Sequence, residues 1–212
     1  MSKLTDLLEK FNRKERFWLL RDLIGSPFLQ ISPEFRSKVA EEIGRPIPEK
    51  VWWAFDYHID WLVAALRTFP AQPELNRWHD NAVSEIKGNQ EDFDLVIAFD
   101  EEIILIEAKT GYFSNSQLKS KLSRLNGIVN IDGRTNSGVT VSFILSAPLR
   151  ELKTLNVEGY FPPWALKIGK PFRIELPIHT DPLMISRCDN VLTKRDIPKK
   201  YAKGKYWAVY RA

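Results

Sequence analysis

The sequence predicts a mixed α/β (α+β) protein, with a central mixed sheet flanked by helices after an all-helical N-terminal region. Three observations support this. Apolar residues recur at spacings of three and four over residues 1–70, short β-branched runs follow at 93–99 and 103–109, and a further run at 139–145 follows an amphipathic stretch. We expect two parts, a helical region over residues 1–70 and a sheet-containing domain over 71–212 that ends in a basic tail.

Helices are expected throughout the first seventy residues. One helical pattern covers residues 4–24. The next covers residues 33–43, with Ser32 as N-cap and Gly44 as the stop signal. A third helix is expected over residues 49–69, and its nearly continuous apolar content predicts that it is buried.

Length and β-branching favour a two-stranded hairpin at 93–99 and 103–109. A short turn at 100–102 would then bring Phe99 near Ile103 and place Asp94 approximately opposite Ala108.

An amphipathic helix is expected over residues 114–129, opening with a capping box from Ser114 to Gln117. It would connect the second strand to a parallel third strand at 139–145. Residues 172–176 and 206–210 are weaker strand predictions.

Composition limits the class of protein. With 44% hydrophobic and 27% charged residues, the chain matches a globular protein rather than a disordered one. The single cysteine, Cys188, cannot form an intramolecular disulfide, and neither a signal peptide nor an apolar membrane-spanning run is present. We therefore expect a cytoplasmic protein with no membrane partner.

Charge is distributed unevenly along the chain. Residues 71–110 carry three Lys/Arg against ten Asp/Glu, whereas residues 111–212 carry seventeen against seven. An acidic block followed by a basic region is expected where carboxylates bind a cation and basic groups hold a polyanion. Clustering of ordinary solvated charges is the alternative.

Two carboxylates and a lysine meet at one end of the predicted hairpin. Glu107 and Lys109 are two apart in a strand and share a face, and Asp94 lies near the start of the partner strand. Burying unpaired carboxylates costs several kcal/mol, so compensation is required. Mg²⁺ (or Mn²⁺) bound by Asp94, Glu107 and the carbonyl of Ala108 would provide it.

The order Asp94, twelve intervening residues, then Glu107-Ala108-Lys109 on consecutive apolar strands before a helix resembles the PD-(D/E)xK nuclease superfamily. The resemblance covers roughly residues 75–147. It implies a restriction-endonuclease-like core of order α-β-β-β-α-β, in which the Asp and Glu bind the metal ion and the Lys assists hydrolysis. Phe93 stands where the motif name has Pro.

The resemblance also implies further site residues. An additional acid would join the metal site, with Glu85 preferred over Glu74, Asp80 and Glu91. Gln117 and Lys121 resemble helix positions that many members turn toward the site, and both are expected to bind nucleic acid. A capping role for Gln117 and simple solvation of Lys121 are the alternatives.

The C-terminal tail is a second candidate contact with nucleic acid. Its basic residues suit the phosphate backbone, although a solvated surface is an equal alternative. The residues expected to bind are Lys194, Arg195, Lys199 and Lys200.

A separate group, Asp56, His58 and Asp60, is less suited to metal binding. On the expected helix the two acids share a face and His58 projects away, so we expect the acids to pair with basic groups or cap loops.

The sequence therefore predicts a magnesium-dependent nuclease whose partner is nucleic acid, DNA rather than RNA, and a homodimer is a further expectation. One alternative is a catalytically inactive nuclease-like module that binds nucleic acid or protein. Another treats Glu107 and Lys109 as an ordinary cross-strand ion-pair ladder in an α+β domain of unrelated function.

Overall fold

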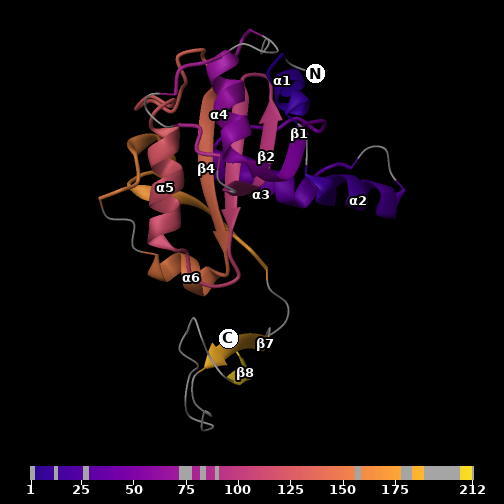
Figure 1. Ribbon diagram of the computed structural model, residues 1–212, viewed down its shortest axis with the longest axis vertical. Coiled ribbons are helices and arrows are strands. Elements are labelled where there is room, and N and C mark those ends of the chain that lie inside the picture. The colour runs from indigo at the N-terminus through magenta and orange to yellow at the C-terminus, as the bar shows by residue number, and fades with distance from the viewer. Residues whose placement is uncertain are drawn as a thin grey trace. The chain divides into compact units, whose positions relative to one another are not determined.

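A six-stranded mixed sheet organises the first part of the chain, in the order β1-β2-β3-β4-β6-β5 (Figure 1). Its strands are β1 (Trp52–His58), β2 (Asp92–Phe99), β3 (Glu102–Ala108), β4 (Thr140–Ala147), β5 (Leu166–Lys167) and β6 (Lys170–Glu175). β1, β2 and β3 are successively antiparallel, whereas β3, β4 and β6 are successively parallel. The predicted mixed α/β class with helices flanking the sheet is confirmed.

The computed structural model describes residues 3–11, 14–25, 29–71, 78–81, 85–88, 91–155, 159–177, 183–188 and 206–211. The chain forms two compact units, Met1–Leu176 and Pro177–Ala212. The first contains the sheet and the helices α1 (Lys3–Lys10), α2 (Glu15–Ile24), α3 (Pro33–Ile43), α4 (Ile59–Thr68), α5 (Asn115–Leu125), α6 (Leu149–Thr154) and η1 (Pro163–Ala165). In the second, β7 (Leu183–Cys188) pairs antiparallel with β8 (Tyr206–Arg211). No helix of the described ranges is both long and apolar enough to cross a membrane.

The sheet is covered on both faces, which produces two separate hydrophobic cores. α1, α4 and α5 pack on one face, where Leu105 and Phe143 belong to the larger core. α2 and α3 contribute to the smaller core on the other face, which contains Ile104 and Ile144. Neighbouring residues of β3 therefore point to opposite cores, as the two-residue period of a strand requires.

The predicted helix over residues 49–69 is wrong in its first half, because residues 52–58 form β1. This strand contributes Trp52 and Ala54 to the larger core and Trp53 to the smaller one. A strand buried on both faces has a continuous apolar run, which periodicity alone cannot distinguish from a buried helix. Residues 1–70 are thus not all helical, and β1 pairs with β2 in the shared sheet.

The helix predicted over 33–43 is confirmed as α3. The Ser32 hydroxyl accepts a hydrogen bond from the Phe35 N–H at 3.2 Å, and Gly44 ends the helix with a φ of 72°. The capping box predicted for α5 is wrong. Ser114 caps no backbone N–H with its side chain, and its hydroxyl lies 2.9 Å from that of Ser116.

The predicted hairpin and its parallel third strand are confirmed as β2, β3 and β4, with α5 as the crossover. The expected register is wrong by one residue, because Phe99 pairs with Glu102 and Leu95 with Ile106. A tighter turn causes this shift. Asp100 supplies it with a φ of 46°, a conformation that Asp tolerates better than most residues.

Candidate functional site

The candidate site lies where β2 and β3 cease to pair. The pairing of the two strands ends at Leu95 and Ile106, and beyond it the Ala108 N–H donates to Asp94 Oδ2 at 2.6 Å. The Asp94 carboxylate thus accepts a hydrogen bond from the partner strand at this end of the hairpin. β4 continues alongside, since the Lys109 N–H donates to the Ser146 carbonyl at 2.9 Å. The site therefore lies at the carboxyl end of two parallel strands, β3 and β4.

Glu107 is the buried centre of the site, with 2% of the residue exposed. Each of its carboxylate oxygens binds a different ammonium group. Lys109 Nζ lies 2.7 Å from Oε1, and Lys121 Nζ lies 2.5 Å from Oε2. A buried carboxylate with both oxygens engaged by charged donors is compensated for its loss of hydration.

Lys121 reaches Glu107 from α5 and is itself buried, with 6% exposed. Its ammonium group also donates to the Asp92 carbonyl at 2.5 Å and lies 5.2 Å from the centroid of the Phe93 ring. The prediction that Lys121 contacts nucleic acid directly does not fit this burial. The sequence carried a signal, since Lys121 lies three residues after Leu118 and four before Leu125, on the apolar side of the helix.

The pKa values of Asp94 and Lys109 are both raised, but for different reasons. Burial, and then repulsion from Glu107, raises the pKa of Asp94, although the Ala108 N–H and the two lysines act in the opposite direction. Burial lowers the pKa of Lys109, but its hydrogen bond to Glu107 and the attraction of both carboxylates outweigh burial and raise it. Lys109 is therefore an ammonium ion at neutral pH. A cation near Asp94 would offset the repulsion between its carboxylate and that of Glu107.

The donors present fit a hard divalent cation. Asp94 and Glu107 supply two carboxylates joined through Lys109, whose Nζ lies 3.6 Å from Asp94 Oδ2. Mg²⁺ commonly binds through one or two carboxylates, with water and phosphate oxygens completing its shell. In the described ranges, no group of three or more His, Cys, Asp or Glu side chains is placed to hold a metal ion.

The additional acid was expected to be Glu85, but this carboxylate is engaged elsewhere. Arg67 of α4 binds both of its oxygens, with Nε 2.7 Å from Oε2. The same guanidinium group donates to the Gly127 carbonyl at 2.9 Å. Arg67 therefore connects α4 both to Glu85 and to the segment that follows α5.

The other expected contacts with nucleic acid remain predictions. Gln117 is exposed on the first turn of α5, one turn before Lys121. Lys194, Arg195, Lys199 and Lys200 lie outside the described residues.

A second buried ionic network also involves α5 and was not predicted as a unit. Arg124, also on α5, has a side chain only 2% exposed and binds Asp60 and Glu91, the latter at 3.1 Å. Asp60 also accepts hydrogen bonds from the backbone N–H groups of Lys87 and Gly88 at 3.2 and 2.8 Å. The expectation that Asp60 pairs with a basic group and caps a loop is confirmed.

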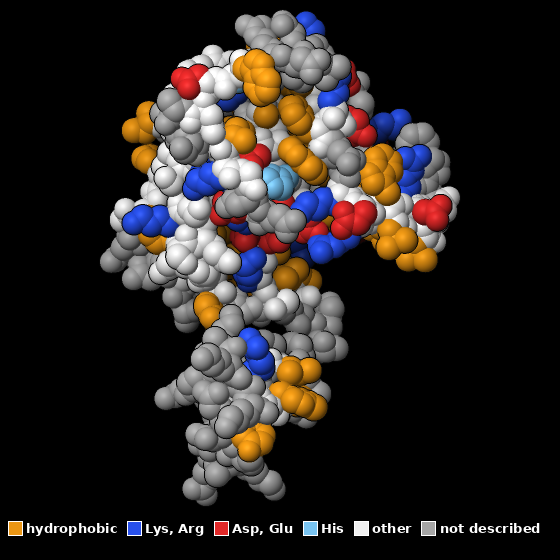
Figure 2. Space-filling view, in the orientation of Figure 1, with side chains coloured by type: hydrophobic (Ala, Val, Ile, Leu, Met, Phe, Trp, Pro, Cys, Tyr) orange, Lys and Arg blue, Asp and Glu red, His pale blue; other side chains and the backbone are white. Residues whose placement is uncertain are grey.

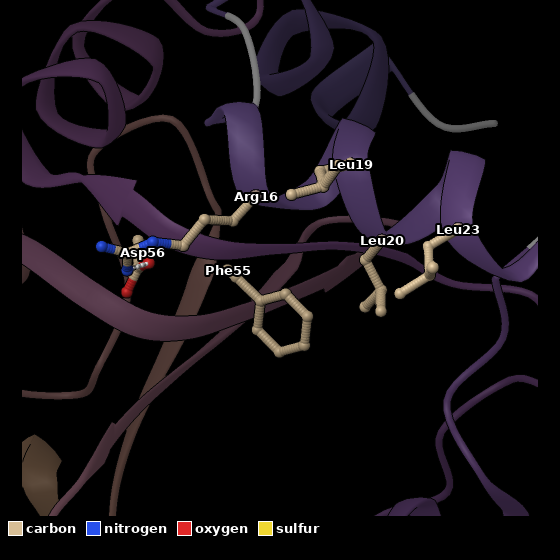
Figure 3. A pocket seen from close by; sticks show the side chains of 6 residues that line it. All are labelled: Arg16, Leu19, Leu20, Leu23, Phe55 and Asp56. Atoms are coloured by element: carbon tan, nitrogen blue, oxygen red, sulfur yellow. Dashed lines mark hydrogen bonds and ion pairs between the residues drawn. The ribbon is translucent and has the colours of Figure 1, made fainter.

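Asp56 lies apart from that network, contrary to the helical arrangement considered for Asp56 and Asp60. It is in β1 with a φ of 45°, and its carboxylate pairs with Arg16 of α2. This pair closes one end of a hollow between α2 and β1 (Figure 3). The remaining lining residues are Leu19, Leu20, Leu23 and Phe55. The two charged residues of this hollow are paired with each other, and its other lining residues are apolar.

Comparison of the chain with protein-family models, with curated proteins and with solved structures finds no match in any of the three.

Proposed function

We propose that the protein is a metal-dependent nuclease that hydrolyses phosphodiester bonds. The observation that carries the proposal is the contact of Lys109 with both Asp94 and Glu107, where the start of β2 lies beside the end of β3. Two carboxylates and an ammonium group form the set that hydrolysis of a phosphodiester with a hard cation needs. The resemblance to PD-(D/E)xK nucleases is supported by the order of two antiparallel strands, a helix and a parallel strand around this set.

Each residue has a role that follows from its surroundings. Asp94 and Glu107 would hold Mg²⁺ or Mn²⁺, which when bound activates water and stabilises negative charge on the phosphate. Lys109, charged and partly exposed, donates a hydrogen bond to the attacking water or to a phosphate oxygen. Lys121 fixes the orientation of Glu107 through Oε2. In the hydrolysis the water oxygen forms a bond to phosphorus, one P–O ester bond breaks, and the leaving oxygen takes a proton.

The test is a cleavage assay with the full chain. We expect purified protein to cut labelled DNA when Mg²⁺ or Mn²⁺ is present and to be inactive in EDTA. Parallel reactions with single- and double-stranded DNA and RNA identify the substrate, for which DNA is the expectation. Absence of cleavage of all four substrates with either cation would contradict the proposal.

Nucleic acid as the partner is supported by the second unit. Residues 177–212 carry eight Lys/Arg against three Asp/Glu, whereas residues 1–176 carry 23 against 24. Within this unit Arg187 of β7 pairs with Trp207 of β8, and both are exposed. Figure 2 shows hydrophobic and basic side chains on the described surface of this unit. An exposed aromatic ring beside basic groups suits the stacking of unpaired bases.

Binding in EDTA should therefore depend on Trp207 and on salt. Trp207→Ala is expected to weaken binding of a labelled single-stranded oligonucleotide about tenfold, because stacking on one base contributes about 1–3 kcal/mol. Affinity should also fall steeply with salt as Lys/Arg contacts release counterions. Fluorescence anisotropy measures both effects. Trp78→Ala removes an indole that is 95% exposed in the first unit and is the matched control. Equal losses in the two variants would refute the assignment.

One observation favours the alternative of an inactive binding module. Both oxygens of Glu107 already bind lysines, so the site is electrically balanced without a cation. Calorimetric titration with Mn²⁺ separates the two functions, because an inactive module of this kind would show no binding to the wild-type chain.

A further inference from the structure

The two lysines that bind Glu107 are held very differently. Lys121 has a side chain 7% exposed, and its ammonium group is fixed by Glu107, the Asp92 carbonyl and the Phe93 ring. Lys109 has a side chain 31% exposed, and its ammonium group lies 2.7 Å from Glu107 Oε1 and 3.6 Å from Asp94 Oδ2. Lys109 can move into water at little cost, whereas moving Lys121 would leave charges unpaired in a buried place.

The position of the Lys109 ammonium group is informative. It bridges Glu107 Oε1 and Asp94 Oδ2, the oxygens that two metal-binding carboxylates would offer to a cation. Oε2 already accepts a hydrogen bond from Lys121. A cation that binds Glu107 Oε1 and Asp94 Oδ2 together would therefore take the place that Lys109 occupies.

Resting on the proposed function, we propose that a divalent cation enters by replacing the Lys109 ammonium group between Glu107 and Asp94, while Lys121 stays on Glu107. The exchange gives a reason for the presence of two lysines, Lys109 and Lys121, at a proposed cation site. Without a cation, the two carboxylates and two ammonium groups balance. With the cation, the same four groups and the metal carry a surplus of two positive charges, which attracts a phosphodiester. Lys109, released from Glu107, is then available to the substrate.

Cation affinity tests the exchange without any measurement of cleavage. Mn²⁺ is titrated calorimetrically into the full chain and into Lys109→Met, whose side chain ends at Cε and therefore lacks the competing ammonium group. We expect Lys109→Met to bind Mn²⁺ about three- to tenfold more tightly, the range that the loss of a partly exposed ion pair implies. Lys119→Met is the control, since Lys119 is exposed on α5 and the substitution removes the same charge. It should alter the affinity less than twofold.

Acetylation of lysines, quantified by mass spectrometry, tests which lysine moves. Mn²⁺ should increase labelling of Lys109 several-fold and leave Lys121 protected. Equal or weaker Mn²⁺ affinity in Lys109→Met, or new labelling of Lys121 with Mn²⁺, would overturn the exchange even if the wild type cleaves nucleic acid. If neither wild type nor Lys109→Met binds Mn²⁺, the exchange and the proposed function both fail.

Discussion

Asp94→Asn is expected to lose metal-dependent cleavage by a factor of about 100 or more and to unfold at a higher temperature than the wild type. Activity falls because the amide oxygen is a weaker cation ligand than a carboxylate, and the removal of one transition-state contact of this kind costs 10²–10³ in rate. Stability rises because burial and repulsion from Glu107 oppose the charge on Asp94. The amide can still accept the hydrogen bond from the Ala108 N–H.

The pH dependence of this effect has a defined sign. The pKa of Asp94 is raised in the folded protein, so its ionised form costs stability above that raised pKa. The cost disappears as the pH falls below the ordinary Asp value of about 4, where Asp94 is protonated in both the folded and the unfolded chain. The difference in melting temperature between Asp94→Asn and the wild type should therefore be largest at neutral pH and vanish in acid.

Asp100→Asn is the matched control for Asp94→Asn. Asp100 is exposed in the turn between β2 and β3, and Asn adopts its positive φ equally well. This variant should retain wild-type cleavage. Full cleavage activity in Asp94→Asn would show that the Asp94 carboxylate takes no part in the reaction. A melting temperature of Asp94→Asn below that of the wild type would contradict the argument that the charge on Asp94 costs stability.

Arg124→Met is expected to lower the free energy of unfolding by about 3–5 kcal/mol, because it leaves two buried carboxylates without their shared cation. The Glu85 carbonyl also loses hydrogen bonds from Arg124 at 2.8 and 3.0 Å. For a chain of this length the melting temperature should fall by roughly 10 °C or more. Thermal and urea unfolding measure both quantities.

Low pH should reduce the loss of stability caused by Arg124→Met. Burial raises the pKa of Asp60, but hydrogen bonds from Lys87 and Gly88, together with Arg124, outweigh burial and lower it. Such a carboxylate stabilises the fold above its unfolded pKa of about 4, and this stabilisation is lost as the pH falls through the lowered value. The advantage of the wild type over Arg124→Met should therefore decrease in acid.

Arg150→Met serves as the comparison for Arg124→Met. Arg150 pairs with the neighbouring Glu151, and its side chain is 79% exposed. Surface ion pairs of this kind contribute about 0–1 kcal/mol, so its melting temperature should stay close to that of the wild type. Similar small shifts in both Arg variants would show that the Arg124 network does not stabilise the fold.

The hairpin and crossover were predictable because their signals are local. Two short β-branched runs, an amphipathic stretch and a third run specify β2, β3, α5 and β4 without reference to distant residues. β1 was not predictable by the same means. Its aromatic residues fill two cores at once, and a strand buried on both faces lacks the alternation that identifies half-buried strands.

The sequence by itself determined the order of elements around Asp94, Glu107 and Lys109 and placed a crossover helix directly after them. Only the tertiary structure decided the partners of those groups. A carboxylate such as Glu85 or Glu91 pairs with the nearest basic group in space, and spacing along the chain does not reveal which one that is.

Lys121 illustrates the same limit. Its helical position predicts a side that faces the sheet, but its contact with Glu107 depends on how α5 packs over β2 and β3. The packing of α5 buries Lys121 and makes it the fixed partner of the central carboxylate, and the sequence alone does not give this contact.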